Sequence, residues 1–227
     1  LDEVAGDPYC KVIVLTGSGR AFCAGLDLKD WGTPPEPGTH PHMHIGIDGQ
    51  AFMSNLTVHM RNTPQVIVAA VNGAAFGGGL ALACAADVRI AASSARFCSA
   101  FIRTGLTGTD IGITYTLPRL IGTSRAFDLI LSGRDIDAAE ADRMGLVSQV
   151  VPDEELLEHT LAYARRMAGY TRTGLVLTKE VLWHNVDNPS MTAAIALENR
   201  NQNIANRAPD VIEFMKAYRQ RTTGASS

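Results

Sequence analysis

The sequence predicts an α/β fold in which parallel strands alternate with helices, followed by a helical C-terminal region. Two observations carry this prediction. An apolar strand, a glycine turn and a run of small residues occur twice, as VIVLTGSGRAFCAGLDL from Val12 to Leu28 and as VIVAAVNGAAFGGGLAL from Val66 to Leu82, a shift of 54 positions (66 − 12). A helical pattern separates the two copies, and helical patterns fill most of the chain after Ser124. Strands joined by helical crossovers form parallel, right-handed units.

The first half alternates strand and helix signals. A β-branched run predicts a buried strand at Lys11–Thr16. Pro, Gly and His mark a loop at Gly32–His44, and apolar residues at four-residue spacing predict a helix from Gly49 to Arg61. The second copy then supplies a strand at Gln65–Val71 and a small-residue helix at Gly78–Ala86.

The second half is mostly helical. Further strands are expected at Asp87–Ala92, near Arg96–Ser99 and at Leu146–Val151. Asp137 and Glu140 supply the N-cap and the acid three residues later that are typical of a capping-box start. Helices are expected at Ser124–Leu131, Ala138–Met144, Glu154–Ala168, Arg172–His184, Ser190–Asn206 and Pro209–Arg219.

Composition narrows the class of protein. The chain has 227 residues, with 46% hydrophobic and 19% charged residues, as in a soluble globular protein with a core. A net charge of −3 and scattered arginines argue against binding to a nucleic-acid backbone. No apolar run reaches transmembrane length and the start is polar, so we expect a cytoplasmic protein that does not contact membrane. Four dispersed cysteines favour reduced core residues.

Several standard cofactor-binding and catalytic motifs are incomplete or absent in this sequence. Gly17-Ser18-Gly19 begins like a dinucleotide-binding fingerprint, but Phe22 occupies the position of the third glycine. The sequence also lacks a phosphate-binding loop, a nucleophile elbow and a zinc-binding HExxH helix. His40-Pro41-His42-Met43-His44 alternates histidines, yet no acid or cysteine accompanies them before Asp48. We therefore interpret this segment as a solvated loop and expect no metal site.

The two glycine turns suggest a different chemistry. Glycine lets a ligand approach the backbone, and amides at a helix start are unpaired. If the fold brings the turns together, two amides can stabilise one oxyanion. Asp110 lies in a third glycine turn, GLTGTDIG, where it is either the N-cap of a helix beginning near Ile111 or a proton-transfer group. Asp27 and Asp87 are expected to be structural.

Four segments keep the order and spacing of a known family: LTGSGRAFCAGLDLK (Leu15–Lys29), AAVNGAAFGGGLALACAADVRIA (Ala69–Ala91), LPRLIG (Leu117–Gly122) and LSGRDIDAAEADRMGLVSQVV (Leu131–Val151). They resemble the crotonase superfamily, also called the enoyl-CoA hydratase/isomerase family. The resemblance implies a crotonase-like spiral of ββα repeats that binds acyl-CoA over residues 1–151. It also implies a C-terminal helical trimerisation region over residues 152–227. Family members usually carry a further strand pair and helix before the first glycine turn.

The resemblance also implies a ligand and its contacts. The substrate would be an acyl-CoA thioester, with coenzyme A as part of the substrate and no separate cofactor. The oxyanion amides carry over to Leu26 and Gly78, while Ala24 and Lys29 match positions that contact the adenine-nucleotide end of coenzyme A. The other expected partners are copies of the same chain, in a homotrimer or a dimer of trimers.

Departures from the family pattern matter for the reaction. Hydratases of the family carry two glutamates at positions that here hold Ala81 and Phe101. Related isomerases and a dehalogenase branch instead place an aspartate before the LPRLIG-like helix, which corresponds to Asp110. The sequence thus predicts an acyl-CoA-processing enzyme, in fatty-acid or related metabolism, that stabilises a thioester enolate. An isomerase or thioester hydrolase with one aspartate in place of a true hydratase, and a non-catalytic acyl-CoA binder, remain open. The acidic balance disfavours an RNA-binding member.

Overall fold

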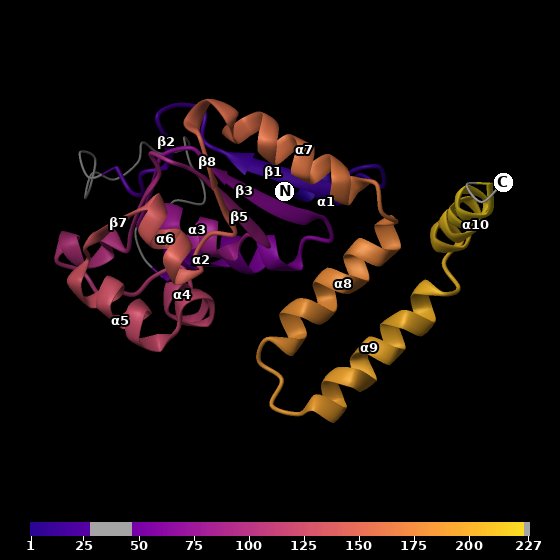
Figure 1. Ribbon diagram of the computed structural model, residues 1–227. Coiled ribbons are helices and arrows are strands. Elements are labelled where there is room, and N and C mark those ends of the chain that lie inside the picture. The colour runs from indigo at the N-terminus through magenta and orange to yellow at the C-terminus, as the bar shows by residue number, and fades with distance from the viewer. Residues whose placement is uncertain (28–46, 225–227) are drawn as a thin grey trace. The chain divides into compact units, whose positions relative to one another are not determined.

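The computed structural model describes residues 1–27 and 47–224 (Figure 1). The chain divides into two compact units. The first unit contains residues 14–62 and 67–161 together with Leu1, and the second contains residues 2–13, residues 63–66 and the chain from residue 162 onward. No helix within the described ranges is long and apolar enough to cross a membrane.

Within residues 1–27 and 47–224 the strands form two four-stranded sheets. One sheet has the order β1 (Val12–Thr16), β3 (Val66–Val71), β5 (Val88–Ala92), β8 (Gln149–Val151). The other has the order β2 (Ala21–Cys23), β4 (Ala74–Phe76), β6 (Arg96–Cys98), β7 (Asp135–Asp137). Strands β3, β5 and β8 pair in parallel, as do β2, β4 and β6, whereas β7 is antiparallel to β6. Successive strand pairs therefore divide between the two sheets, which confirms the expected ββα repeats.

Helices connect and follow these strands. The short helix α1 (Asp2–Ala5) precedes β1, and the 3₁₀ segments η2 (Ala100–Thr104) and η3 (Asp153–Glu155) lie before α4 and α7. The remaining helices in the described residues are α2 (Ile47–Asn62), α3 (Gly78–Ala85), α4 (Ile113–Ile121), α5 (Thr123–Ser132), α6 (Ala138–Met144), α7 (Leu156–Ala168), α8 (Arg172–Asn185), α9 (Met191–Ala205) and α10 (Pro209–Gly224). The expected strands and helices on described residues are confirmed, with shifts at some of their ends.

Side-chain caps explain where several helices begin. Asp137, Thr171 and Ser190 each accept a hydrogen bond from the amide three residues further on, at the starts of α6, α8 and α9. Such caps satisfy amide donors that lack a partner within the helix. The N-cap expected at Asp137 is therefore confirmed.

The core of the first unit is built from small and β-branched residues. All of β3 is buried, and α3 buries alanines along most of its length. The buried guanidinium of Arg89 donates to the carbonyl oxygens of Leu146 and Ala86 at 2.7 Å and of Ala83 at 3.3 Å. Burial lowers the pKa of Arg89. These bonds satisfy carbonyls at the C-terminal end of α3, which fixes the helix that carries the second glycine turn.

Asp87 has the structural role that we expected. Its carboxylate accepts a hydrogen bond of 2.7 Å from the amide of Ile67, at the start of β3. The backbone amide of Asp87 donates in turn to the carbonyl of Ile67 at 2.9 Å. This pair ties the end of α3 to β3 within the first unit.

Lysine side chains that donate hydrogen bonds to backbone carbonyl oxygens connect distant segments of the second unit. Lys11 donates to the carbonyls of Ala168 and Tyr170 at 2.9 and 2.8 Å, and buried Lys179 donates to the carbonyl of Gln65 at 2.9 Å. Helices α8 and α9 run side by side in this unit (Figure 1).

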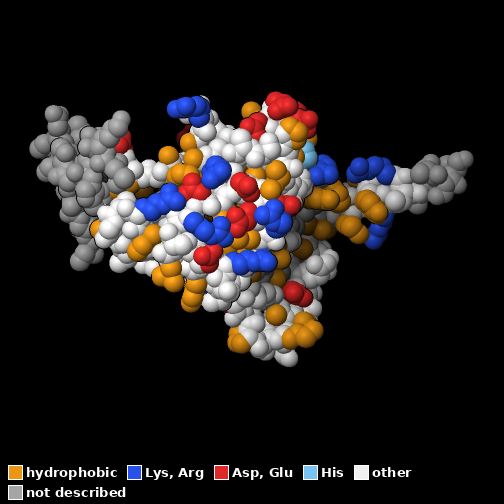
Figure 2. All heavy atoms as spheres, turned by 60° about the vertical axis from the view of Figure 1, so that its left-hand side comes forward, with side chains coloured by type: hydrophobic (Ala, Val, Ile, Leu, Met, Phe, Trp, Pro, Cys, Tyr) orange, Lys and Arg blue, Asp and Glu red, His pale blue; other side chains and the backbone are white. Residues whose placement is uncertain are grey.

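Charges of both signs share the surface of the molecule that Figure 2 shows. Lys and Arg side chains lie among Asp and Glu side chains there rather than in a block of one sign. This distribution agrees with the small net charge of −3.

Candidate active site

The glycine turns of the two sequence copies lie against each other in the first unit. A Cβ placed on Gly25, whose φ is +90°, would lie 3.0 Å from the carbonyl oxygen of Phe76 and 4.0 Å from Cα of Gly77. A Cβ placed on Gly79 would lie 2.0 Å from the carbonyl oxygen of Cys23. The backbones approach too closely for side chains at these positions, which explains why both turns require glycine.

The amides of Leu26 and Gly78 are the pair expected to form the oxyanion site. Gly77 adopts φ +53° and donates its amide to the carbonyl of Cys98 at 2.9 Å, so that α3 starts at Gly78. An amide in the first turn of a helix has no acceptor within the helix. Among the described residues, no acceptor is found for the amide of Gly78 or for that of exposed Leu26. Two amides that have no acceptor in the described part of the chain thus lie on adjoining turns.

Apolar side chains cover the second turn. The ring of Phe101 comes within 3.7 Å of a Cβ placed on Gly77, and Cδ1 of Ile111 within 3.3 Å of one placed on Gly78. Ala81 is buried in α3. Positions 101 and 81, which the resemblance matches to glutamates of hydratases, therefore carry an aromatic ring against the turn and a buried methyl group.

Asp110 lies next to Ile111 and is held by two donors. Its Oδ1 accepts hydrogen bonds from the amide of Ile111 at 2.7 Å and from the side-chain amide of Gln50. Gly112, at φ +76°, is the N-cap of α4, and the carbonyl of Asp110 accepts from the amide of Ile113 at 2.9 Å. The interpretation of the Asp110 side chain as a helix cap is therefore wrong, because α4 begins later than expected and the carboxylate turns toward α2.

Ile111 adopts a strained backbone. Its φ of +48° is the only positive value for a non-glycine residue within the described ranges. A β-branched residue in this region costs about 1–3 kcal/mol, and such strain gathers at functional sites. The amide of Ile111 donates to Asp110, and its carbonyl accepts from Thr57 Oγ1 of α2 at 3.4 Å. These contacts hold Ile111 where its side chain meets Gly78.

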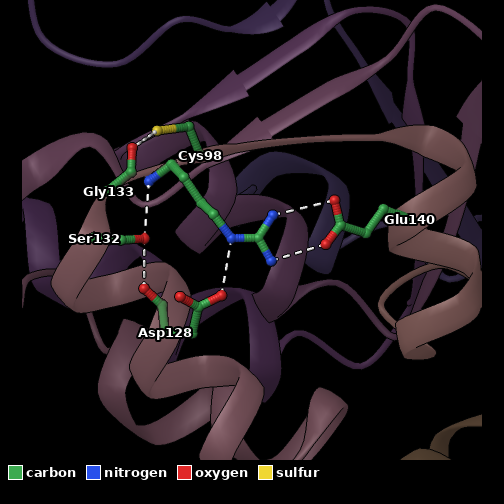
Figure 3. Close-up of polar contacts among 6 residues, drawn as sticks. Cys98, Asp128, Ser132, Gly133 and Glu140 are labelled. Carbon is green, nitrogen blue, oxygen red and sulfur yellow. Dashed lines mark hydrogen bonds and ion pairs between the residues drawn. The ribbon is translucent and has the colours of Figure 1, made fainter.

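A charged network links the end of α5 to α6. Arg134 donates to both oxygens of Glu140, at 2.8 and 3.1 Å, and to Asp128 at 2.8 Å; Figure 3 shows the two carboxylates approaching from different sides. The hydrogen bonds from Arg134 lower the pKa of Glu140.

Gly133, the residue before Arg134, packs against η2, the segment that carries Phe101. Cys98 donates to the carbonyl of Gly133 at 3.1 Å, and burial raises the pKa of Cys98 to about 11 (Figure 3). A Cβ on Gly133 would lie 2.7 Å from Cγ2 of Ile102 in η2. The end of α5 and η2 are therefore packed closely, which fixes the backbone on either side of Phe101.

The structure describes four of the five predicted site residues. Leu26, Gly78 and Asp110 all belong to the first unit, and exposed Ala24 directly follows β2. Lys29, like the loop and the histidine segment, lies outside the described residues. Sequence reasoning missed Gln50 and the backbone of Ile111. The polar side of an amphipathic helix does not mark which residue reaches a neighbour, and a strained φ has no sequence signal.

Comparison with known proteins identifies the family. The family model described as "Enoyl-CoA hydratase/isomerase" matches residues 1–223. The chain belongs to this family. It is 45% identical over 202 residues to the probable enoyl-CoA hydratase EchA12 of Mycobacterium tuberculosis, covering 89% of this chain and 71% of the relative. It is 36% identical over 218 residues to the 1,2-epoxyphenylacetyl-CoA isomerase of Escherichia coli, covering 96% and 81%.

Solved structures agree with the fold. A probable enoyl-CoA hydratase/isomerase from Mycobacterium abscessus matches with a TM-score of 0.84 and 37% identity, covering 97% of this chain and 82% of that one. A monofunctional enoyl CoA isomerase from M. smegmatis matches with a TM-score of 0.69 and 43% identity, covering 86% and 80%. The expected membership of the crotonase superfamily and the α/β fold are confirmed.

Proposed function

We propose that the chain binds an acyl-CoA thioester and moves a double bond along its acyl group by proton transfer, through an enolate, rather than by adding water. One observation supports this proposal. The carboxylate of Asp110 is held by two hydrogen-bond donors and lies beside the second glycine turn, which apolar side chains cover. Ala81 and Phe101 supply no acid where hydratases of the family carry two. Isomerisation needs one group that accepts and returns a proton, and Asp110 is suited to that work.

The backbone amides stabilise the charge that develops. In our proposal the amides of Leu26 and Gly78 donate to the thioester oxygen. Asp110 takes a proton from an acyl carbon; the C–H electron pair forms a carbon–carbon double bond, and negative charge moves to the thioester oxygen. The same carboxyl then returns the proton to another carbon, so that atoms balance without a co-reactant. Each oxyanion donor is typically worth about 10²–10³ in rate.

The surroundings favour proton transfer over hydration. Phe101 and Ile111 line the second turn with apolar surface, which offers no polar group to hold the water that hydration and hydrolysis require. Two relatives, at 43% and 36% identity, are described as isomerases.

Other features of the proposal rest on the family resemblance. Coenzyme A enters as part of the substrate, with Ala24 and Lys29 at its adenine-nucleotide end, and no separate cofactor is required. Apolar side chains such as Met191 and Tyr218, 79% and 55% exposed on α9 and α10, are suited to assembly into trimers or pairs of trimers. The cytoplasmic location stays a prediction.

Replacing Asp110 tests the proposal. Wild-type protein mixed with a 3-enoyl-CoA thioester in D₂O should exchange the acyl α-proton and shift the double bond. The Asp110→Asn variant should retain thioester binding, measured by calorimetry, and lose turnover. Asp142→Asn makes the same charge change at an exposed position of α6 and should behave as wild type.

Three outcomes would contradict the proposal. Full turnover by Asp110→Asn would leave the carboxylate without a catalytic role. Tight binding without any exchange, across a panel of acyl-CoA thioesters, would indicate a non-catalytic binder. Rapid hydration of crotonyl-CoA would show that water reaches the acyl group.

A further inference from the structure

Helix α2 reaches the carboxylate of Asp110 through Gln50. The side-chain amide of Gln50 donates to Oδ1, the oxygen that also accepts from the amide of Ile111 at 2.7 Å. Among the described residues, no donor is found for Oδ2. The two oxygens of one carboxylate are therefore in different surroundings, one bonded twice and one open.

This asymmetry matters for proton transfer. The bond that turns an aspartate carboxylate has a broad, roughly two-fold torsional profile, so its oxygens interchange unless something holds them. Two N–H donors hold Oδ1 and neutralise part of its negative charge, since hydrogen bonds to an ionised acceptor are strong. The unbonded Oδ2 keeps the lone pair that is available to a substrate proton.

We propose that Gln50 is a positioning residue, which with the amide of Ile111 fixes Oδ1 of Asp110 and so assigns proton transfer to Oδ2. This inference rests on the proposed function and deepens it. Oδ2 takes the proton as the substrate C–H bond breaks, and gives it back as the new C–H bond forms. Gln50 stays bonded to Oδ1 throughout and does not touch the reacting atoms.

The side chains that contact Asp110 and Ile111 lie on one face of α2. Thr57 lies seven positions after Gln50 (57 − 50), which is two helical turns, so the two side chains project from the same face. Thr57 Oγ1 donates to the carbonyl of Ile111 at 3.4 Å. The same helix face thus holds both the carboxylate and the strained backbone beside it, and movement of α2 would disturb both.

Two variants of Gln50 test the role. Gln50→Leu keeps similar bulk without a donor, and Gln50→Glu places an acceptor against Oδ1. Because Gln50 is exposed, both variants should fold, with thermal midpoints near that of wild type. With a 3-enoyl-CoA thioester, kcat should fall about tenfold or more, because misplaced catalytic groups are costly, while KM stays within about twofold.

The matched control is Asn55→Asp, which also replaces an exposed amide on α2 by an acid and should keep wild-type kcat. Wild-type kcat in Gln50→Leu, a rise in KM without loss of kcat, or an equal loss in Asn55→Asp would each overturn the inference. The Asp110→Asn variant separates the two proposals. If it is inactive while the Gln50 variants are fully active, only the role of Gln50 fails; if it is fully active, the proposed function fails as well.

Discussion

Substituting Gly79 by alanine should push the two glycine turns apart. A Cβ at this position would lie 2.0 Å from the carbonyl oxygen of Cys23, whereas real contacts essentially never fall below 3.0 Å. The backbone at Cys23, the last residue of β2, must therefore move away by about 1 Å. Leu26 lies only three residues after Cys23. Displacements of this size can cost about 10²-fold in rate. We expect a loss of at least that factor in kcat/KM, with about 1–3 kcal/mol of lost stability from overpacking.

The assay is α-proton exchange with an acyl-CoA thioester, run beside urea unfolding. Gly19→Ala is the matched control, because a Cβ at Gly19 meets nothing within 4 Å, and it should keep wild-type activity. Gly78→Ala is an intermediate case, since its Cβ would meet the flexible end of Ile111 at 3.3 Å and the amide is retained. Wild-type exchange by Gly79→Ala would refute the claim that the two turns act together.

Two further predictions concern charge and burial. Glu140→Gln should cost at most about 1 kcal/mol at pH 7. Because the hydrogen bonds from Arg134 lower the pKa of Glu140, this contribution is present above the unfolded-state pKa and is lost as the pH falls through the folded-state pKa, so urea midpoints of variant and wild type should converge on acidification. Burial raises the pKa of Cys84 to about 11, so iodoacetamide should label this thiol at pH 8 only after unfolding. The same shift predicts that the stabilisation from Cys84 is lost as the pH rises from about 9 to 11; labelling of Cys84 itself in the folded protein at pH 8 would contradict this account.

Long periodic segments could be predicted from the sequence, whereas several short strands could not. The strand at β3 and the helices of the second half extend over enough residues for apolar spacing to show. Strands β2, β4 and β7 have three residues each, too few for a period. Their position depends on pairing with partners far along the chain, as in the register of Ala21 with Ala74. The repeats they complete were expected from the family resemblance alone.

The candidate site, too, could be predicted from the sequence only in part. Glycines mark the two turns because a missing side chain is visible in a sequence, and the structure shows the close approach at Gly25 and Gly79 that requires them. The surroundings of Asp110 could not be predicted. The bond from Gln50 and the positive φ of Ile111 arise from packing of α2 against the third glycine turn, which no local pattern encodes.

A crystal structure with a bound enoyl-CoA thioester tests the central claim most directly. Our account predicts that the main-chain nitrogens of Leu26 and Gly78 both lie about 2.7–3.1 Å from the same thioester oxygen, the distance at which oxyanion donors act. A thioester oxygen bound to other groups, or in reach of only one of these nitrogens, would contradict it.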